Sequence, residues 1–322
     1  MTGVWRGLDA IPQGFGPSVV TVGNFDGVHV GHQRILSSAA ALASRDRMES
    51  VALTFDPHPL QVVAPAQAPQ SLTGIAQRAG LIRQQGIDRV AVLPFTRGLS
   101  RLSPREFAER VLARKLAART VVVGANFRFG RSQAGDVSEL GKLGSALGFD
   151  VELVDTVVVG DEAVSSTRLR GLVRAGLVEE ARQLLGREFS LQGRIVRGDG
   201  IGAKRTVPTL NLAPDSEVLP ADGVYVSLTR RDGRPDCHES ITNVGMRPTF
   251  NGRRRTVETY LLGGLGAAPP RAIELKFLRK IRDERKFPSA ESLRQQIQAD
   301  IEVAARYFRR RRSQPAGSSV SS

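Results

Sequence analysis

Two histidines stand three residues apart in a turn rich in glycine. The turn is Gly-Asn-Phe-Asp-Gly-Val-His-Val-Gly-His, residues 23–32, with His29 and His32. It follows an apolar, β-branched run at residues 19–22, which predicts a buried parallel strand, and it leads into a helix predicted from Gly31. Glycines let a ligand approach the backbone, and the first turn of a helix offers free N–H groups and a positive dipole. The turn therefore predicts a polyphosphate site.

The histidine pair is a specific signal. With four histidines and 33 glycines in 322 residues, about 0.005 copies of His-x-Gly-His are expected by chance. The alternative is an ordinary strand-to-helix turn that contains two histidines without using them.

Polar side chains also follow two further strands. His58 stands in Asp-Pro-His-Pro directly after the apolar run 50–55, and Asn126 stands in Gly-Ala-Asn-Phe-Arg-Phe-Gly after the run 120–123. Ligands of open α/β sheets bind outside the carboxyl ends of the strands, so we expect His58 near the first turn. A proline-stiffened surface loop and an aromatic plug in the core are the alternatives for these two segments.

A group of hydroxyls precedes a later helix. Ser165, Ser166 and Thr167 stand at the predicted helix start, where hydroxyls commonly cap free N–H groups. Arg168 and Arg170 follow directly. Because an ordinary cap needs neither three hydroxyls nor two arginines, this group is a candidate binding element as well as a cap.

These four segments resemble the motifs of the HxGH nucleotidyltransferase superfamily, in the form found in its flavin-adenylylating branch. The resemblance implies that His29 and His32 act in catalysis and that residues 165–170 hold the triphosphate. It implies nucleotide contacts from Gly23, Asn24, Phe25, Asp26, His29, Gly31, His32, Asn126, Ser165, Ser166, Thr167, Arg168 and Arg170. It implies flavin contacts from Phe55, Asp56, His58, Pro59 and Phe127.

A second glycine-rich stretch lies at residues 198–211, where basic side chains and a hydroxyl accompany the glycines. Backbone N–H groups and point charges suit phosphates, and the hydroxyl of Thr209 and the amide of Asn211 can share one Mg²⁺. The stretch lacks the Gly-x-x-x-x-Gly-Lys-Ser/Thr order and no helix follows, so it is not a Walker P-loop. Taken alone, it is equally typical of a hairpin loop.

This stretch resembles the riboflavin kinase barrel, whose mark is Pro-Thr-x-Asn after a glycine loop, and residues 243–250 and 257–262 resemble that family too. The resemblance implies that Glu258, otherwise typical of a strand surface, accepts the proton of the attacking flavin hydroxyl. It implies nucleotide contacts from Gly198, Gly200, Gly202, Lys204, Pro208, Thr209 and Asn211, with Mg²⁺ on Thr209 and Asn211. Residues 205–207 and Leu210 depart from the family pattern, and we expect them to reshape the nucleotide loop.

The elements that must position these groups fall into two parts. Strands and helices alternate from residue 17 to about 175, which predicts an α/β doubly wound parallel sheet. Besides the runs named above, strands are expected at 89–93 and 151–154, and the run 157–159 is expected to extend or pair with the latter. Later strands follow one another without helices, which predicts a small antiparallel β-barrel. These strands are expected at 191–196, 223–229, 240–244, 256–262 and 272–277.

One amphipathic helix closes the barrel, with Leu293, Ile297, Ile301 and Phe308 at helical spacing. We expect an adenylyltransferase domain at residues 1–186 and a kinase barrel at 187–310. A disordered, basic and serine-rich tail follows at 311–322.

The composition is that of a soluble globular protein, with 41% hydrophobic and 24% charged residues. No apolar run is long enough to span a membrane and the first residues lack a signal-peptide core, so we expect a cytoplasmic protein without a membrane partner. The single Cys237 excludes an internal disulfide and a cysteine-built zinc site. The net charge of +14 is spread over the chain, so nucleic acid is not an expected partner. Self-association is left open.

Together these features predict a bifunctional enzyme of flavin cofactor synthesis. The barrel would phosphorylate riboflavin to FMN with ATP and Mg²⁺, and the α/β domain would join FMN to the adenylyl group of a second ATP, giving FAD and pyrophosphate. One alternative is a nucleotidyltransferase of another substrate class with a barrel that only binds. The other is a non-enzymatic nucleic-acid or regulatory protein.

Overall fold

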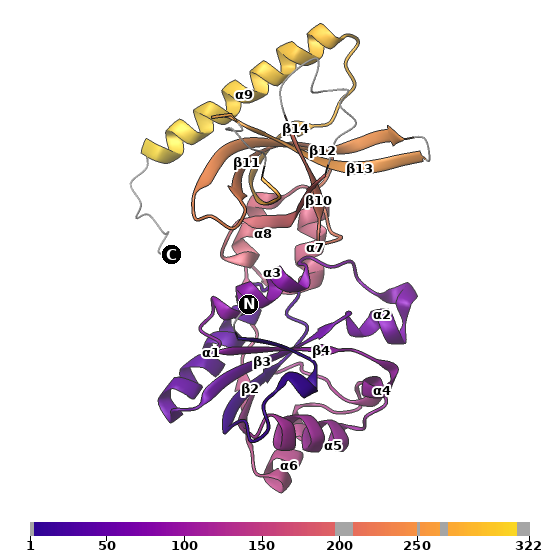
Figure 1. Ribbon diagram of the computed structural model, residues 1–322, viewed down its shortest axis with the longest axis vertical. Coiled ribbons are helices and arrows are strands. Elements are labelled where there is room, and N and C mark those ends of the chain that lie inside the picture. The colour runs from indigo at the N-terminus through magenta and orange to yellow at the C-terminus, as the bar shows by residue number, and fades with distance from the viewer. Residues whose placement is uncertain (1–2, 197–208, 250–251, 265–269, 314–322) are drawn as a thin grey trace. The chain divides into compact units, whose positions relative to one another are not determined.

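The computed structural model describes residues 3–196, 209–249, 252–264 and 270–313. The chain forms two compact units, Met1–Ser166 and Thr167–Ser322 (Figure 1). This division falls before the expected boundary at residue 186. The reason is that α7 (Ser166–Arg174) and α8 (Val178–Leu185) count with the second unit, where α8 packs against strands of the barrel.

The first unit contains one parallel sheet of six strands, in the order β1-β4-β3-β2-β5-β6. The strands are β1 (Val4–Arg6), β2 (Ser18–Val22), β3 (Glu49–Asp56), β4 (Arg89–Pro94), β5 (Ala118–Gly124) and β6 (Asp150–Val154). Five of them confirm the sequence prediction. The sixth, β1, was not predicted, because three residues between Gly3 and Gly7 are too few to show a periodic pattern.

Helices cover both faces of this sheet, which confirms the doubly wound fold. On one face, Val19 of β2 packs with Leu36 of α1 (Val30–Asp46) and Ile82 of α3 (Ile75–Arg83). On the other face, Val20 packs with residues of α5, η3 and α6. The remaining helices are η1 (Leu8–Ala10), α2 (Pro59–Val63), η2 (Pro65–Gln67), α4 (Arg97–Ser100), α5 (Pro104–Phe107), the π-helical η3 (Ala108–Lys115), η4 (Arg131–Gln133) and α6 (Val137–Leu147).

The strand order changes direction beside β2. The chain moves from β2 to β3 and β4 on one side and then returns to β5 on the other. Ligands of such sheets bind at this switch point, outside the carboxyl ends of the strands. The histidine turn follows β2 and the loop with Asn126 follows β5, so the two predicted segments flank the switch point.

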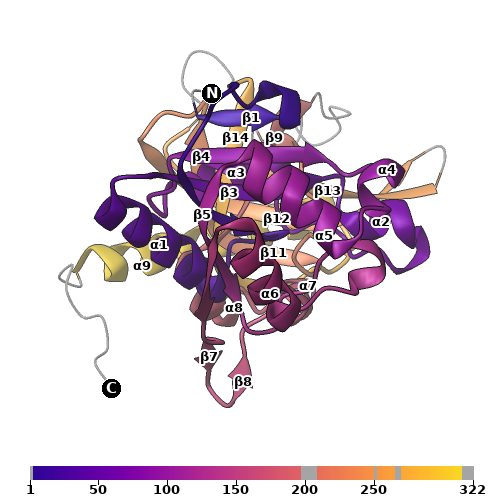
Figure 2. The same ribbon diagram turned by 90° about the horizontal axis from the view of Figure 1, so that it is seen from below.

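A small hairpin corrects one sequence expectation. The run 157–159 neither extends nor pairs with β6. Instead β7 (Val158–Val159) pairs antiparallel with β8 (Glu162–Ala163), and the two form a separate hairpin (Figure 2). The turn at Gly160, with a φ of 66°, makes this local pairing available within a few residues.

The second unit contains a closed antiparallel barrel of six strands, in the order β10-β13-β12-β11-β14-β9. Its strands are β9 (Phe189–Val196), β10 (Leu210–Pro214), β11 (Gly223–Arg231), β12 (Cys237–Thr249), β13 (Gly252–Leu261) and β14 (Ala272–Asp283). The barrel confirms the prediction, except that β10 was assigned to the glycine-rich loop. Its alternation of buried Leu210 and Leu212 with polar Asn211 is too short a signal to separate a strand from a loop.

Part of the barrel interior is a network of hydroxyl groups. Ser227, Thr229, Ser240, Thr242 and Thr259 are fully buried, and their hydroxyls lie 2.7–3.4 Å from one another along the network. Buried hydroxyls are tolerated when they are paired with one another. These side chains fix which face of each strand points inward, and their neighbours in sequence therefore point outward.

The last helix, α9 (Ala290–Ser313), packs on the outer face of the barrel. Ala304 and Phe308 bury themselves against apolar side chains of β11 and β12. Arg282 at the end of β14 donates hydrogen bonds of 2.8–3.1 Å to both carboxylate oxygens of Asp300, which is 4% exposed. This bidentate ion pair fastens the middle of α9 to the barrel.

The helix continues into the predicted tail. Arg311 donates to Glu188 at 3.1 Å, and Arg312 pairs with Glu239. Residues 311–313, expected in the disordered tail, are therefore the end of α9, and the rest of the tail lies outside the described residues. Within the described ranges, no helix is long and apolar enough to cross a membrane.

Gly193→Ala is expected to destabilise the barrel. Gly193 on β9 faces β10, and a Cβ there would overlap the carbonyl oxygen of Ala213. Because the obstacle is backbone, the closing strand pair must separate, and overpacking of this kind costs about 1–3 kcal/mol. We expect a melting temperature several degrees lower in thermal unfolding followed by circular dichroism. Gly171→Ala, on α7 with open space around it, is the matched control and should keep or raise the melting temperature.

Candidate functional sites

The histidine turn has an unusual backbone that ends in a helix cap. Phe25, Gly27 and Val28 have φ values of 48°, 81° and 42°, so the chain reverses sharply before α1. His29 is the N-cap residue, and its Nδ1 accepts a hydrogen bond of 3.2 Å from the backbone N–H of His32. Because Nδ1 is an acceptor, a neutral His29 carries its proton on Nε2, which makes Nε2 a hydrogen-bond donor.

The two histidine rings are stacked. Their centroids lie 3.6 Å apart with 15° between the ring planes, and the edge of Phe25 packs on His32 at 5.4 Å. A Cβ at Gly31 would lie 3.2 Å from Nδ1 of His29, and one at Gly23 would lie 3.0 Å from the ring of Phe25. Both glycines of the signature therefore leave room for aromatic rings as well as for a ligand.

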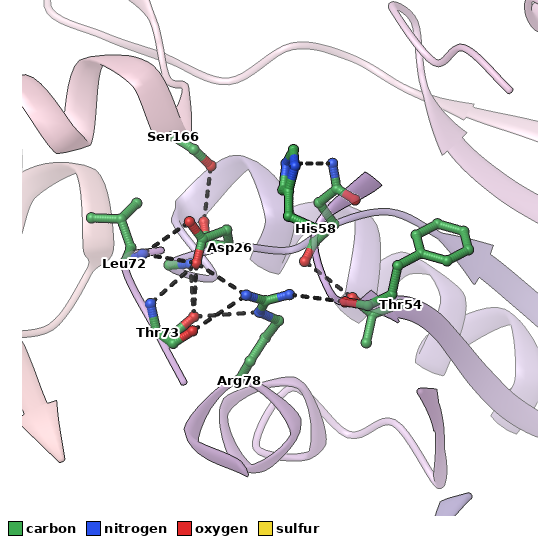
Figure 3. A network of polar contacts seen from close by, with 10 residues as sticks. Asp26, Thr54, His58, Leu72, Thr73, Arg78 and Ser166 are labelled. Carbon is green, nitrogen blue, oxygen red and sulfur yellow. Dashed lines mark hydrogen bonds and ion pairs between the residues drawn. The ribbon is translucent and has the colours of Figure 1, made fainter. Parts of the chain in front are cut away.

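Asp26 supports the turn from inside. Its side chain is 2% exposed and accepts hydrogen bonds of 3.0–3.1 Å from the backbone N–H groups of Leu72 and Thr73 and from the Thr73 hydroxyl (Figure 3). Arg78 lies 3.3 Å from the same carboxylate. The sequence prediction gave Asp26 a nucleotide contact, but these partners direct its carboxylate into the protein, where it holds the loop before α3.

The structure places His58 beside the same turn. Its Nδ1 accepts a hydrogen bond of 3.2 Å from the N–H of Leu60 and so caps α2, while its Nε2 lies 3.2 Å from the side-chain amide of Asn24 (Figure 3). The hydroxyl of Thr54 donates to the carbonyl of Asn24 at 3.0 Å. The turn after β2 and the loop after β3 are therefore linked twice, and three of the four histidines lie at this edge of the sheet.

The first hydroxyl of α7 also contacts the turn. Ser166 donates its hydroxyl hydrogen to the carbonyl oxygen of Asp26 at 2.9 Å. Ser165 and Arg168 are half-buried, Thr167 is exposed, and Arg170 is 7% exposed. Because the only hydroxyl hydrogen of Ser166 is donated to Asp26, this hydroxyl links the turn to the start of α7.

The predicted flavin residues flank the carboxyl ends of β3 and β5. Phe55 is half-buried and packs edge-on against Phe95 at 5.4 Å, Asp56 is exposed, and Pro59 opens α2. Asn126 is exposed after β5. Phe127 is half-buried and stacks at 5.5 Å on Phe129, which joins the core. The aromatic plug and Asn126, the predicted ligand contact, are therefore neighbouring parts of one segment.

A second candidate site lies on the outer face of the barrel. Asn211 on β10 and Asn243 on β12 are both in register with Glu258 on β13, so the three side chains form a row across adjacent strands. The hydroxyl of Thr256 donates to Oε1 of Glu258 at 3.3 Å. Because Val257 and Thr259 are buried inside the barrel, this row faces outward, toward α9.

A cavity of about 370 Å³ adjoins this row. Glu258, Asn243 and Thr209 contribute polar groups to its wall. The apolar part of its wall includes Val224, Ile241, Phe287, Leu293, Ile297 and Ile301. Leu293 and Ile297 were predicted only as the packing face of the helix, and the structure places them over the cavity instead.

Five predicted residues of the second site, Gly198, Gly200, Gly202, Lys204 and Pro208, lie outside the described residues. Leu210 is described, and its position corrects an expectation. It pairs with Thr259 and is 4% exposed, so its side chain fills the barrel interior, on the opposite face from Asn211. Its bulk therefore does not point toward the site.

Among its described residues, the second site offers a magnesium ion a few neutral oxygen donors and no cage of protein ligands. In the part of the chain that the structure describes, no group of three or more His, Cys, Asp or Glu side chains could hold a metal ion. Thr209 lines the cavity and Asn211 stands next to Glu258, and both offer a neutral oxygen. Mg²⁺ commonly keeps several waters and takes other ligands from substrate phosphates, so this sparse donor set fits it.

Several residues of these sites carry no sequence signal of their own. Thr73 and Arg78 stand outside every motif, and only the structure brings them to Asp26. Asn243 stands within a stretch that resembles the kinase family, but its place beside Glu258 depends on strand register. Register between strands far apart in sequence is set by the assembled barrel and is not visible in a local pattern.

Two family models match the chain in succession, FAD synthetase over residues 12–168 and riboflavin kinase over residues 185–308. The bifunctional riboflavin kinase/FMN adenylyltransferase of Pseudomonas fluorescens is 35% identical over 300 residues, covering 93% of this chain and 96% of that protein. The protein of the same name from Escherichia coli K12 is 33% identical, covering 90% and 92%. A solved structure described as a macrolide-efflux protein from Streptococcus pneumoniae aligns with a TM-score of 0.82 at 28% identity, covering 94% and 98%.

Both halves of the chain are thus matched in the order in which the two sites occur. The chain belongs to the bifunctional riboflavin kinase/FMN adenylyltransferase family, with an FAD synthetase domain followed by a riboflavin kinase domain.

Proposed function

We propose that the barrel phosphorylates riboflavin to FMN and that the α/β unit adenylylates FMN to FAD. The observation that carries this assignment is that each half has its own reactive groups. His29 and His32 are stacked at the ligand edge of the sheet, and Glu258 stands in the wall of a largely apolar cavity. A nucleotidyltransferase of another class with a barrel that only binds is disfavoured, because the riboflavin kinase model matches the whole barrel.

The cavity beside Glu258 suits riboflavin. Phe287, Leu293 and Ile297 offer apolar walls to the flat ring system, and Glu258 and Thr209 offer polar contacts to the sugar-alcohol chain. The terminal hydroxyl oxygen of riboflavin attacks the γ-phosphorus of ATP, and its proton passes to Glu258. The bond between the γ-phosphorus and the bridging oxygen breaks, and ADP leaves.

Thr209 and Asn211 hold Mg²⁺ with the phosphates of ATP in this proposal. When bound, the cation offsets negative charge on the transferred phosphoryl group. Asn211 is in register with Glu258, so a nucleotide held at Asn211 has its phosphates beside the base. We assign further nucleotide contacts to Gly198, Gly200, Gly202, Lys204 and Pro208, which lie outside the described residues.

The α/β unit needs no protein nucleophile. The phosphate of FMN is an anion at neutral pH and attacks the α-phosphorus of ATP directly, with pyrophosphate as the leaving group. His29, His32 and the N–H groups at the start of α1 stabilise the charge of the transition state. Asn24 and Asn126 contact the nucleotide, and the loop with His58 holds the flavin.

The remaining phosphate contacts come from the start of α7. We assign these contacts to Ser165, Thr167, Arg168 and Arg170, while the hydroxyl of Ser166 donates to Asp26. Both reactions consume ATP, and we place the enzyme in the cytoplasm on that ground.

Gly31→Ala is expected to lower FAD formation without lowering FMN formation. The added methyl group meets Nδ1 of His29 at 3.2 Å, so the ring must shift by a few tenths of an ångström relative to His32. A misplacement of this size lowers kcat for FMN adenylylation about 10-fold to 100-fold. Chromatography of FMN and FAD measures both products in one sample. His32→Ala should show a larger loss, and wild-type FAD formation by both variants would refute this site.

Glu258→Gln is expected to have the opposite selectivity. Glutamine keeps the size of the side chain but cannot take the proton, so riboflavin phosphorylation should fall roughly 10²-fold to 10⁴-fold. Adenylylation of added FMN should stay at the wild-type rate. Glu302→Gln, on the exposed side of α9, is the matched control. If Glu258→Gln makes FMN at the control rate, the base is not Glu258.

A further inference from the structure

We propose that Arg78, which stands outside every motif, is a positioning residue for adenylyl transfer. It acts by holding the histidine turn, residues 23–32, and the loop with His58 after β3 in one fixed arrangement. The inference rests on the proposed function of the α/β unit and adds a residue to it.

The guanidinium of Arg78 lies among three segments of that unit. Arg78 belongs to α3 and its side chain is 7% exposed. Its Nη2 donates to Oδ1 of Asp26 and to the carbonyl of Thr73, both at 3.3 Å. Its Nε and Nη1 donate at 3.4 Å to the Thr73 hydroxyl and to the carbonyl of Phe55 (Figure 3). The three nitrogens of one planar group thus reach acceptors on the turn after β2, the end of β3 and the loop before α3.

Two of these acceptors stand just before functional histidines. Asp26 precedes His29 by three residues, and Phe55 precedes His58 by three residues. A shift of either acceptor is therefore carried along the backbone to a histidine. The contact between His58 and Asn24 already shows that the two loops meet, and Arg78 braces them from behind.

The buried carboxylate of Asp26 requires a cation of the right shape beside it. The carboxylate of Asp26 is buried, and its neutral donors from Leu72 and Thr73 leave a full negative charge that Arg78 neutralises. Removing the cation leaves a buried charge without its counter-charge, which is strongly destabilising, so the turn that carries Asp26 loses the contact that fixes it. A lysine keeps the charge but has one nitrogen on a flexible stem, which cannot reproduce the planar fork between Asp26 and Phe55.

The test uses Arg78→Lys and Arg78→Gln in the full chain. We expect kcat for FMN adenylylation to fall about 10-fold or more for the lysine variant and about 100-fold for the glutamine variant. The KM values for ATP and FMN should change less than kcat, because the groups that contact substrate are still present. Riboflavin phosphorylation by the same sample reports on the barrel and should keep its wild-type rate.

Two controls separate positioning from simple loss of structure. Arg83→Gln makes the same change on an exposed residue of α3 and should leave both activities unchanged. All assays are run well below the melting temperature of each variant. If Arg78 only stabilises the fold, its loss would then leave kcat unchanged. If the glutamine variant does not fold, the lysine variant decides.

The double variant Asp26→Asn/Arg78→Gln provides an independent measurement. If the two side chains act as one unit, its adenylylation rate should be no lower than that of Arg78→Gln alone. Folded Arg78 variants with kcat within 2-fold of the Arg83→Gln control would overturn the inference, as would equal loss of both activities. Absence of FAD formation by the wild-type chain would instead refute the proposed function.

Discussion

The adenylyl-transfer half depends on one buried ion pair, between Asp26 and Arg78. The carboxylate of Asp26 lies almost wholly out of water, and backbone N–H groups, a hydroxyl and Arg78 offset the cost of burying it. The same residue belongs to a turn in which Phe25 and Val28 have left-handed backbone angles, each costing about 1–3 kcal/mol. Because the network holds the turn in this shape, His29 is placed to cap α1 and to stack on His32.

The kinase half positions its groups by a different means. There Asn211, Glu258 and Asn243 stand on regular strands, and the register of the closed barrel aligns them. Hydroxyls inside the barrel and the ion pair between Arg282 and Asp300 keep strands and helix together. One half therefore relies on loops fixed by a buried charge and the other on strand geometry, so a substitution that disturbs one mode of positioning need not disturb the other.

The sequence predicts much of this architecture, since long periodic strands and helices carry their own signal. It identifies five of the six strands of the parallel sheet and most of the barrel, and it directs attention to the histidine turn. It misses β1 and β10 because each is short and lies beside glycines or a glycine-rich loop. It also assigns Asp26 to the nucleotide, since a carboxylate in a signature turn gives no sign of whether it points inward or outward.

Contacts between segments far apart in the chain cannot be predicted from local sequence patterns. Leu210 was expected to reshape the nucleotide loop, but whether it points into the barrel or out of it depends on a register set by β13. Arg78 reaches Asp26 only after β2, β3 and α3 have assembled. The residues that we propose to contact substrate stand in recognisable motifs, whereas the residues that hold them in place are recognisable only in the fold.

A chain that performs two successive reactions at two sites should form FMN and FAD one after the other. The most direct measurement is a time course in which the purified chain is incubated with riboflavin, ATP and Mg²⁺ and the flavins are separated by chromatography. We expect FMN to appear first and then to decline as FAD accumulates, and added FMN to be adenylylated without riboflavin. Formation of FMN alone, or no FAD from added FMN and ATP, would contradict this expectation.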